Sequence, residues 1–563
     1  MGNLKKRLRR PYRAVKRLVG NGAASKNKGS STVPSAVTPS VQPASERVEK
    51  LVLEPLADAQ INGPKAIYDL DRTNLLGRYH LPKLSRMARE DQSLLVEPLL
   101  SLKRLKKLGL NADSFAYPEA RWKMIYNLVD ANTPGVGEVE AKVVFSGLKT
   151  SELNAFMSQQ DSRCISVESP TLLIDETLLV PSNTRLYGNY TQLLRDSADV
   201  EKAILLDGVK DVLVYGFCID SCCRYPIYVK NCSRFALIGN TITNNSFKSI
   251  TIMGENELFS IKLNRLVNSG NGGIFLNGSI SKGVIENNTI EGTRGGGNFS
   301  GGIVLSSIEI ADINTAFNPW RPWEMTDLTD SPHELVILNN QIVRGEANGM
   351  YSHAGYCNYF VGNNVEENNK EGMCLDFGSC GCYVAYNTFK RNGGRFNMTQ
   401  HDLEDDFIQD FGVLPDGSSP AKIPGISLDN AAYNIIYHNI ISENYGSGFK
   451  IVRSGLRNVV LCNEITDNNL GQNDRFHFFG VEFGSDYKPD YEAEGVHELD
   501  FTPCFENIIA RNTISGNHYS GIFMGKDAYI NDAFDNVIIG SVHPVEVISN
   551  RLNALVNNHV ITV

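Results

Sequence analysis

Apolar residues alternate with other residues in a set of short segments, each led by a glycine, in the second half of the chain. The segments read GIFLNG, GIVLSS, GMYSHA, GMCLDF, GISLDN, GFKIVR, GVEFGS and GIFMGK, and their glycines stand at 273, 302, 349, 372, 425, 448, 480 and 521. Alternation of this kind predicts β-strands that bury one face. The first and third residues after each glycine are almost all apolar. We therefore expect these two positions to face the core and the second and fourth to face outward.

A second pattern, an asparagine two residues before an apolar residue, recurs at nearly constant spacing. It is found at Asn240, Asn264, Asn288, Asn340, Asn363, Asn387, Asn439, Asn463 and Asn512. Five intervals are 23 or 24 residues, and the other three are 49 or 52. A fixed period indicates stacked units that share one core. We expect each asparagine to satisfy turn backbone and to stack on the asparagine of the next unit. The long intervals predict inserted loops near 306–335, 391–424 and 470–505.

The stretch that precedes the repeat carries a resemblance to a known family. SELNAFMSQQ at 151–160 is a short amphipathic segment, and brief β-rich runs after it lead into VPSNTRLYG, Val180 to Gly188. These residues resemble the entry to right-handed parallel β-helices of the pectate-lyase-like superfamily, where a short helix plugs the open end of the coil. The resemblance covers roughly residues 148–545. It implies an all-β fold, a right-handed parallel β-helix in which one period of about 24 residues is one coil.

Three regions are predicted. Residues 1–47 form a basic head and a disordered linker rich in Ser, Pro, Gly and Ala. Residues 48–147 form a small, mainly helical region, in which Leu99, Leu102, Leu105 and Leu108 recur every third residue beside Lys and Arg. Residues 148–563 form the β-helix with its inserted loops.

Charge and cysteine content narrow the classes of function. The first seventeen residues hold eight Lys or Arg and no acid, although the net charge of the chain is -9. The body is therefore acidic, which argues against nucleic acid as a partner. The head is either a solvated tail or a contact, through residues 1–17, with an anionic membrane or a protein.

The chain shows no apolar run of the roughly 18 residues that span a membrane, and its head lacks the apolar core of a secretory signal. Its 11 cysteines lack the spacing of a disulfide framework or of a paired zinc motif. We expect reduced, buried thiols and a location that is cytoplasmic or peripheral to a membrane.

The outward positions become polar in the middle coils. Because neighbouring parallel strands lie about 4.8 Å apart, these side chains should form one connected surface. The candidates on this surface are Tyr351, His353, Asp376, Asp429 and Lys450, with Arg453 just beyond its strand and Glu482 one coil further.

Asp376 and Asp429 are expected to lie side by side, where two carboxylates repel unless something compensates. They could supply oxygen ligands to Ca²⁺. They could instead form the acid and base pair of a glycosidase, or each could accept structural hydrogen bonds. No organic cofactor is expected.

The resemblance adds a chemistry to these residues. Members of the superfamily that cleave or epimerise acidic polysaccharides place carboxylates, often with Ca²⁺, beside Lys, Arg, His or Tyr. It implies that Lys450, Arg453 or a metal offsets the uronate carboxylate while Tyr351 and His353 transfer protons. The chain lacks the Asp-Pro-His-Asp motif of mannuronan epimerases and the Gly-His-Gly and Arg-x-Lys motifs of polygalacturonases.

Further substrate contacts are expected around this outward-facing surface. RFHFFGVEFGSDYKPDYEAEGVHELDF at 475–501 holds His477, Glu482 and Tyr487, and His518 and Tyr519 precede the last glycine-led segment. These residues could wall a groove and stack sugar rings. The alternative is a loop packed on itself.

The sequence thus favours an enzyme that acts on an acidic polysaccharide or oligosaccharide by β-elimination or uronate 5-epimerisation. Glycoside hydrolysis by the paired aspartates is an alternative. A non-catalytic glycan-binding or tailspike-like protein is another.

Overall fold

The structure, a computed structural model, describes most of the chain from Pro118 onward. The described residues are 118–137, 143–160, 163–196, 199–220, 223–295, 299–307, 331–376, 379–394, 423–429, 431–452, 455, 457–470, 479–484, 504–516, 519–525, 528–529, 531–548 and 553–562. The predicted basic head and linker at 1–47 lie outside them, as do residues 48–117 of the predicted helical region and most of the three predicted loops.

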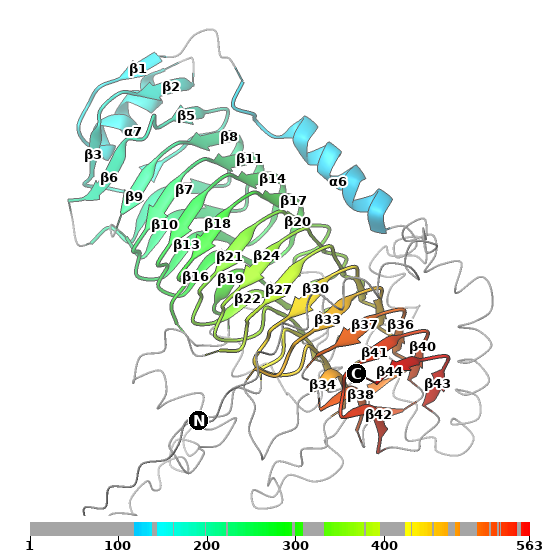
Figure 1. Cartoon of the computed structure of the whole chain (residues 1–563). Coiled ribbons are helices and arrows are strands. Elements are labelled where there is room, and N and C mark those ends of the chain that lie inside the picture. Colours follow the sequence, from blue (N-terminus) through cyan, green and yellow to red (C-terminus); the bar gives the residue numbers. More distant parts are fainter. Residues whose placement is uncertain are drawn as a thin grey trace, which may run out of the picture. The chain divides into compact units, whose positions relative to one another are not determined.

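Within the described residues, parallel strands stack coil upon coil into three long sheets, A, B and C (Figure 1), and each complete coil contributes one strand to each sheet.

Sheet C contains the 13 strands β4 (Leu178–Leu179), β7 (Lys202–Asp207), β10 (Tyr225–Lys230), β13 (Lys248–Met253), β16 (Gly272–Asn277), β19 (Gly301–Ser306), β22 (Asn348–His353), β25 (Met373–Asp376), β28 (Ile426–Asp429), β31 (Phe449–Val452), β34 (Phe479–Phe483), β38 (Ser520–Met524) and β42 (His543–Val547).

Sheet A contains the 15 strands β1 (Val143–Phe145), β2 (Cys164–Val167), β5 (Arg185–Tyr187), β8 (Lys210–Tyr215), β11 (Ser233–Ile238), β14 (Asn256–Lys262), β17 (Ile280–Glu286), β20 (Val336–Leu338), β23 (Tyr359–Val361), β26 (Tyr383–Ala385), β29 (Ile435–Tyr437), β32 (Val459–Leu461), β36 (Ile508–Ala510), β40 (Asp532–Phe534) and β43 (Ala554–Val556). A short pair, β35 (Cys504–Phe505) and β39 (Ala528–Tyr529), stands apart from these sheets.

Sheet B contains the 14 strands β3 (Thr171–Ile174), β6 (Gln192–Arg195), β9 (Cys218–Asp220), β12 (Thr241–Thr243), β15 (Arg265–Val267), β18 (Thr289–Glu291), β21 (Gln341–Val343), β24 (Asn364–Glu366), β27 (Thr388–Lys390), β30 (Ile440–Ser442), β33 (Glu464–Thr466), β37 (Thr513–Ser515), β41 (Val537–Ile539) and β44 (His559–Ile561).

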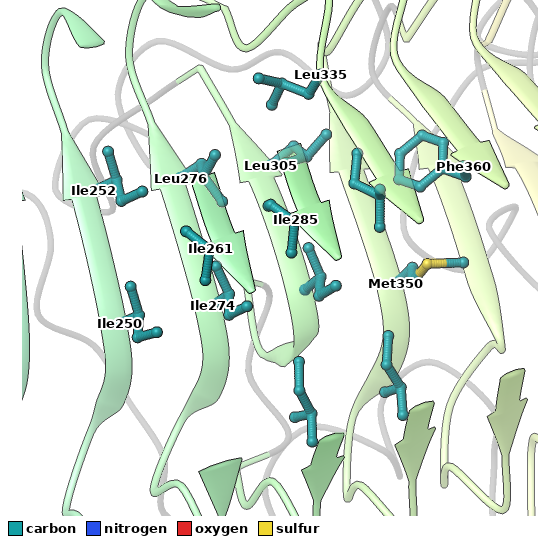
Figure 2. Close-up of a cluster of buried hydrophobic side chains, with 14 of the residues drawn as sticks. Ile250, Ile252, Ile261, Ile274, Leu276, Ile285, Leu305, Leu335, Met350 and Phe360 are labelled. Atoms are coloured by element: carbon teal, nitrogen blue, oxygen red, sulfur yellow. The ribbon is translucent and has the colours of Figure 1, made fainter. Parts of the chain in front are cut away.

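The core runs through the inside of the coils as columns of like residues. Ile250, Ile274, Ile303, Met350 and Met373 follow one another on adjacent strands of sheet C, and all are fully buried. Several of these side chains point inward toward residues of sheet A in Figure 2. Burial of each aliphatic side chain contributes roughly 1.5–3 kcal/mol to the free energy of folding. A single coil has no neighbouring coils against which to bury these side chains, so it could not fold by itself.

The predicted asparagine ladder occupies the corner between sheets A and B. Asn363 shows the repeating bonds: its backbone N–H and its Nδ2 donate to Asn387 Oδ1 at 2.8 and 2.9 Å, and Nδ2 also donates to Ile337 O at 2.9 Å. Asn340 donates to Asn363 Oδ1 in the same way. The ladder therefore satisfies backbone that the corner would otherwise bury unpaired, and the structural role predicted for these residues is confirmed.

Two further asparagine ladders stand at the other corners, and the sequence pattern did not reveal them. One leads into sheet A and includes Asn434, Asn458, Asn507, Asn531 and Asn553. The other leads into sheet C and includes Asn368, Asn392, Asn444 and Asn468.

Two helices precede the long stack in the described part of the chain. Helix α7 (Thr150–Gln159) buries Leu153 and Met157 in the core at the first coils, where the sequence predicts a plug. Helix α6 (Pro118–Asn132), within the predicted helical region, packs Ile125 and Val129 on the outer face of sheet A.

Polar contacts fix α6 at both ends. Tyr383 Oη donates to Glu119 Oε2 at 3.4 Å near its start. Lys262 Nζ lies 3.1 Å from Asp130 Oδ1 near its end. Helix α6 therefore runs against the direction in which the coils stack, from β26 back to β14.

Two boundaries differ from the sequence prediction. Strand β34 lies inside 470–505 and confirms the strand predicted at the glycine-led segment of Gly480, so the predicted third loop does not cover residues 479–483. Strand β1 begins at Val143, before the boundary predicted at residue 148, because it pairs with β2.

Most of the ten cysteines within the described residues are buried, as predicted. No helix among the described residues is long and apolar enough to cross a membrane.

Replacing one rung of a buried ladder should destabilise the fold without changing its outer face. We expect Asn363→Ala to lower the free energy of unfolding by about 3 kcal/mol, because it leaves corner backbone groups unpaired. Urea denaturation followed by circular dichroism measures the change.

Asn364→Ala is the matched control, because this neighbouring asparagine is only partly buried on the outward side of β24. An equal loss of stability in both variants would contradict the structural role of the ladder.

Candidate functional site

The register of sheet C brings the predicted residues together in two columns. The first column pairs Tyr351, Cys374, Ser427, Lys450 and Glu482 across β22, β25, β28, β31 and β34; the second pairs His353, Asp376 and Asp429 across the first three. Both columns match the register predicted from the glycine-led segments. We call these eight residues the ladder.

The ladder lies on the outer face of the sheet. The strand residues that alternate with the ladder, such as Met373 and Leu375, belong to the main core. Two ladder residues, Tyr351 and Cys374, belong to a separate apolar cluster with Phe275 and Val304. The glycine that leads each segment stands at an inward-facing position, where there is no room for a side chain. A Cβ on Gly349 would lie 2.2 Å from Val365 Cγ1 in the core, so this position faces inward.

The residues of the predicted connected surface do lie together, but the ladder is largely buried. The exposed fraction is 1% for His353, 5% for Asp376, 6% for Tyr351 and 7% for both Asp429 and Glu482. Lys450 is more exposed, with a quarter of its side chain accessible. Because these side chains are buried, the effective dielectric constant around them is low, and their charges interact more strongly than exposed charges would.

Tyr351, Asp376 and His353 form the centre of the ladder. Tyr351 Oη donates a hydrogen bond of 2.6 Å to Asp376 Oδ2, and His353 Nδ1 lies 3.9 Å from Asp376 Oδ1. Burial raises the pKa of Tyr351 well above its usual value, and the Asp376 carboxylate raises it further. Burial lowers the pKa of His353 to about 3, so this imidazole is neutral near pH 7.

Lys450 and Glu482 form an ion pair at the next two strands. Lys450 Nζ lies 3.0 Å from Glu482 Oε1, and Ser447 Oγ donates to Glu482 Oε2 at 2.9 Å. Glu482 thus holds the Lys450 ammonium in place. The substrate contact predicted for Glu482 stays a prediction.

A third outward column, missed in the sequence, precedes the glycines. It includes Glu371 and Ser447, which precede the inward-facing Gly372 and Gly448, and Lys248, which precedes Ser249 and pairs with Gly272 in the same register. Burial raises the pKa of Glu371, and Asp429 also raises it while Lys370 and Lys450 lower it. Glu371 is therefore a third carboxyl group in the electrostatic surroundings of Asp429. In the sequence, Glu371 and Ser447 could have been assigned to this column because each directly precedes the glycine of a glycine-led segment.

Lys248 is the most deeply buried cation of this column, at 1% exposure. Its Nζ donates to Phe299 O at 2.7 Å and lies 3.8 Å from the centre of the Phe275 ring. Burial lowers the pKa of Lys248 to about 7.

Tyr519 is the remaining described candidate, and it lies at the far end of the ladder. Its ring lies 6.5 Å from that of Phe479 and 4.9 Å from that of His543. Arg453, His477, Tyr487 and His518 lie outside the described residues.

The predicted Ca²⁺ ligands, Asp376 and Asp429, do stand on adjacent strands. Within the described residues, however, no group of three or more His, Cys, Asp or Glu could hold a metal ion. Ca²⁺ takes six to eight oxygen ligands. Asp376 and Asp429 would supply only part of this coordination shell, and the Ca²⁺ site stays a prediction.

Comparison with known proteins identifies the fold. Residues 202–389 match a family model described as a right handed beta helix region. The chain carries a right-handed parallel β-helix. The fold predicted from the repeat is thereby confirmed.

Solved structures with a similar fold are distant in sequence, and no curated protein matches. The A-module of the mannuronan C-5 epimerase AlgE4 of Azotobacter vinelandii is 13% identical, covering 70% of this chain and 91% of its own (TM-score 0.41). The catalytic unit of a GH87 alpha-1,3-glucanase of Streptomyces thermodiastaticus is 12% identical, covering 75% and 70% (TM-score 0.45). The Dettilon tailspike protein is 14% identical, covering 59% and 64% (TM-score 0.35). At these identities none of them indicates what this chain does.

The lowered pKa of Lys248 makes stability depend on pH. Between about pH 7 and the usual 10.5 the unfolded chain binds a proton at this lysine that the folded chain does not, so stability rises with pH. From pH 7 to pH 9 we expect a gain of about 2 kcal/mol relative to Lys248→Met, measured by urea denaturation. A stability difference between the two proteins that stays constant with pH would contradict a buried lysine of low pKa.

Proposed function

We propose that this β-helix is an enzyme that acts on a polysaccharide, and that its substrate contains uronate residues. The observation that supports the proposal is the clustering of Tyr351, His353 and Asp376 beside the ion pair of Lys450 and Glu482 on one face. Burial of hydrogen-bonded polar groups at this density costs stability and is common at sites of chemistry.

The proposed reaction starts with removal of the proton alpha to the uronate carboxylate. The neutral His353 imidazole is the base, because a group already protonated could not accept that proton. The Lys450 ammonium offsets the negative charge that develops on the carboxylate.

Two outcomes follow from the carbanion. In β-elimination its electron pair forms the C4–C5 double bond, the C4–O bond breaks, and the leaving oxygen takes a proton. In 5-epimerisation a proton returns to C5 from the opposite face. Tyr351 is the proton donor in either case, with Asp376 orienting its hydroxyl.

Hydrolysis is a second candidate, favoured by the pairing of Asp376 with Asp429 on adjacent strands. One carboxyl group would protonate the leaving oxygen and the other would activate water or attack the sugar. Glu371, whose pKa is raised, is a further acid for this reaction.

A panel of uronate and neutral polysaccharides, incubated with and without Ca²⁺, separates these reactions. Unsaturated ends that absorb in the ultraviolet identify a lyase, altered uronate NMR signals without cleavage an epimerase, and new reducing ends alone a hydrolase. We expect a product from a uronate substrate. Binding without any product would leave a glycan-binding protein and overturn the enzyme proposal.

The aspartates should be essential to that activity. We expect Asp376→Asn and Asp429→Asn each to lower kcat by about 10²–10⁴-fold while leaving the circular dichroism spectrum unchanged. Asp220→Asn is the matched control, because Asp220 accepts a hydrogen bond from Thr243 on sheet B, away from the ladder. Full activity in the Asp376→Asn, Asp429→Asn double variant would contradict the placement of the site.

A further inference from the structure

Aromatic side chains gather on the outer face of sheet C at its early strands, where β7, β10 and β13 lie side by side (Figure 1). Tyr228 faces outward because it follows Ile227 of the main core along β10, and Tyr225 lies two residues before Ile227's inward position and pairs with Lys202 in register. The ring of Phe247, just before β13, lies 5.3 Å from that of Tyr225. All three rings are partly exposed.

Two basic side chains lie over these rings. Arg224 Cζ lies 5.4 Å from the centre of the Tyr225 ring and 4.8 Å from that of Phe247. Lys202 Nζ lies 4.7 Å from the centre of the Tyr228 ring. Contacts of this kind occur about once per 70–80 residues in proteins, whereas three of them fall here on adjacent coils. The rings therefore hold both cations on the outer face.

No carboxylate of the described residues neutralises these two cations. No ion pair or hydrogen bond there joins Arg224 or Lys202 to an acidic side chain, although Glu201 and Asp207 lie at the two ends of β7. By contrast, Arg234 on sheet A donates to both oxygens of a carboxylate. Arg224 is also exposed, so its N–H groups are available to an anion from outside the chain.

Lys248 is the buried basic residue of this region. Its Nζ lies 5.3 Å from the centre of the Phe247 ring and 3.8 Å from that of Phe275. It pairs with Gly272, and Gly301 follows on the next strand, so the two positions beside it carry no side chain. At 1% exposure Lys248 supports the Phe247 ring from below and does not itself face a ligand.

The rings and cations share the outer face of sheet C with the ladder but lie on different strands. Four strand steps separate β10 from β22, about 19 Å at 4.8 Å per step. A polymer with a carboxylate on each sugar residue is long enough to contact both places, whereas a short oligomer contacts one. An aromatic ring beside a guanidinium matches a sugar ring that bears a carboxylate.

We propose that Arg224 and Lys202, held on the rings of Tyr225, Phe247 and Tyr228, form a second binding site for a uronate residue of an acidic polysaccharide. The inference rests on the proposed function for the class of ligand. The two cations bind the carboxylate, and the rings pack against the sugar. A polymer held at both sites binds more tightly than one held at the ladder alone, because the second contact forms within one complex.

Calorimetric titration with alginate, polygalacturonate and uronate trimers tests this site. The full-length protein is titrated in the Asp376→Asn background, so that the ligand is not consumed. The Arg224→Gln, Lys202→Gln variant should bind a polymeric uronate about tenfold more weakly, because charge-assisted contacts are lost. The loss should be smaller for trimers, which do not bridge the two sites. Unchanged affinity for the polymers in this variant, with an unchanged circular dichroism spectrum, would overturn the inference.

The Arg234→Gln, Lys282→Gln variant is the matched control. It removes the same charge from sheet A, where both side chains already pair with carboxylates of the chain. It should bind the polymers as the unaltered protein does. An equal loss of affinity in this control would show that only the overall charge matters, and would overturn the inference.

A third variant, Tyr225→Leu, Phe247→Leu, tests the rings without changing any charge. It keeps apolar side chains at both positions but no longer holds Arg224 over a ring, so it should also weaken binding of the polymers. Full affinity in this variant would overturn the role of the rings. Polyphosphate should bind more weakly than alginate, and polyphosphate binding as tight as that of alginate would overturn a site for sugar.

A failure of the proposed function is distinguishable from a failure of the inference. If the unaltered protein converts no uronate, the enzyme proposal fails, while a selective loss of polymer affinity in the Arg224→Gln, Lys202→Gln variant still supports the second site. If uronates react and that variant keeps full affinity, the second site fails and the enzyme proposal stands. Absence of binding to both polymers overturns the inference.

Discussion

Every coil of this protein has to bury three corners, and each corner exposes backbone that cannot reach a strand partner. The asparagine ladders meet this constraint, since Asn363 both receives two bonds from Asn340 and gives two to Asn387. Because the rungs bond directly to one another, a ladder fixes the height of each coil relative to the next. The register of the strands follows, and with it the columns that place one side chain beside another on the outer face.

This dependence explains why so much of the fold was predictable. Nine ladder asparagines and eight glycine-led segments repeat with one period, so the period alone predicts the columns that bring Asp376 beside Asp429. The ladder that leads into sheet A was missed although its rungs, like those of the first ladder, stand two residues before an apolar residue, as Asn434 does before Ile436. The ladder that leads into sheet C was missed because most of its rungs lack this neighbour. The ladder that leads into sheet A also passes through Cys382, whose backbone N–H donates to Asn434 Oδ1, so a residue other than asparagine interrupts the pattern.

The site was predictable only as far as the period extends. Tyr351, His353, Asp376 and Lys450 follow from the alternation along each strand, and their roles stay predictions. Phe299 and the reach of Lys248 do not follow, because Phe299 precedes its strand at no repeated position and Lys248 depends on two missing side chains in the next coils. Burial of the ladder was missed for the same reason, since alternation predicts direction and not accessibility. Glu371 could have been predicted to face outward because it directly precedes Gly372, but outward positions were assigned only after each glycine.

The bonds of the asparagine ladders are the same whether two successive rungs are separated by a short or a long stretch of chain. Asn387 bonds to Asn439 across 52 residues with the same atoms and nearly the same distances as Asn363 to Asn387 across 24. The additional chain between β27 and β28 therefore leaves Asp376 and Asp429 paired in register as before. The stack and the segments between its coils can accordingly diverge at different rates, because the register of the outward-facing columns does not depend on the length of those segments.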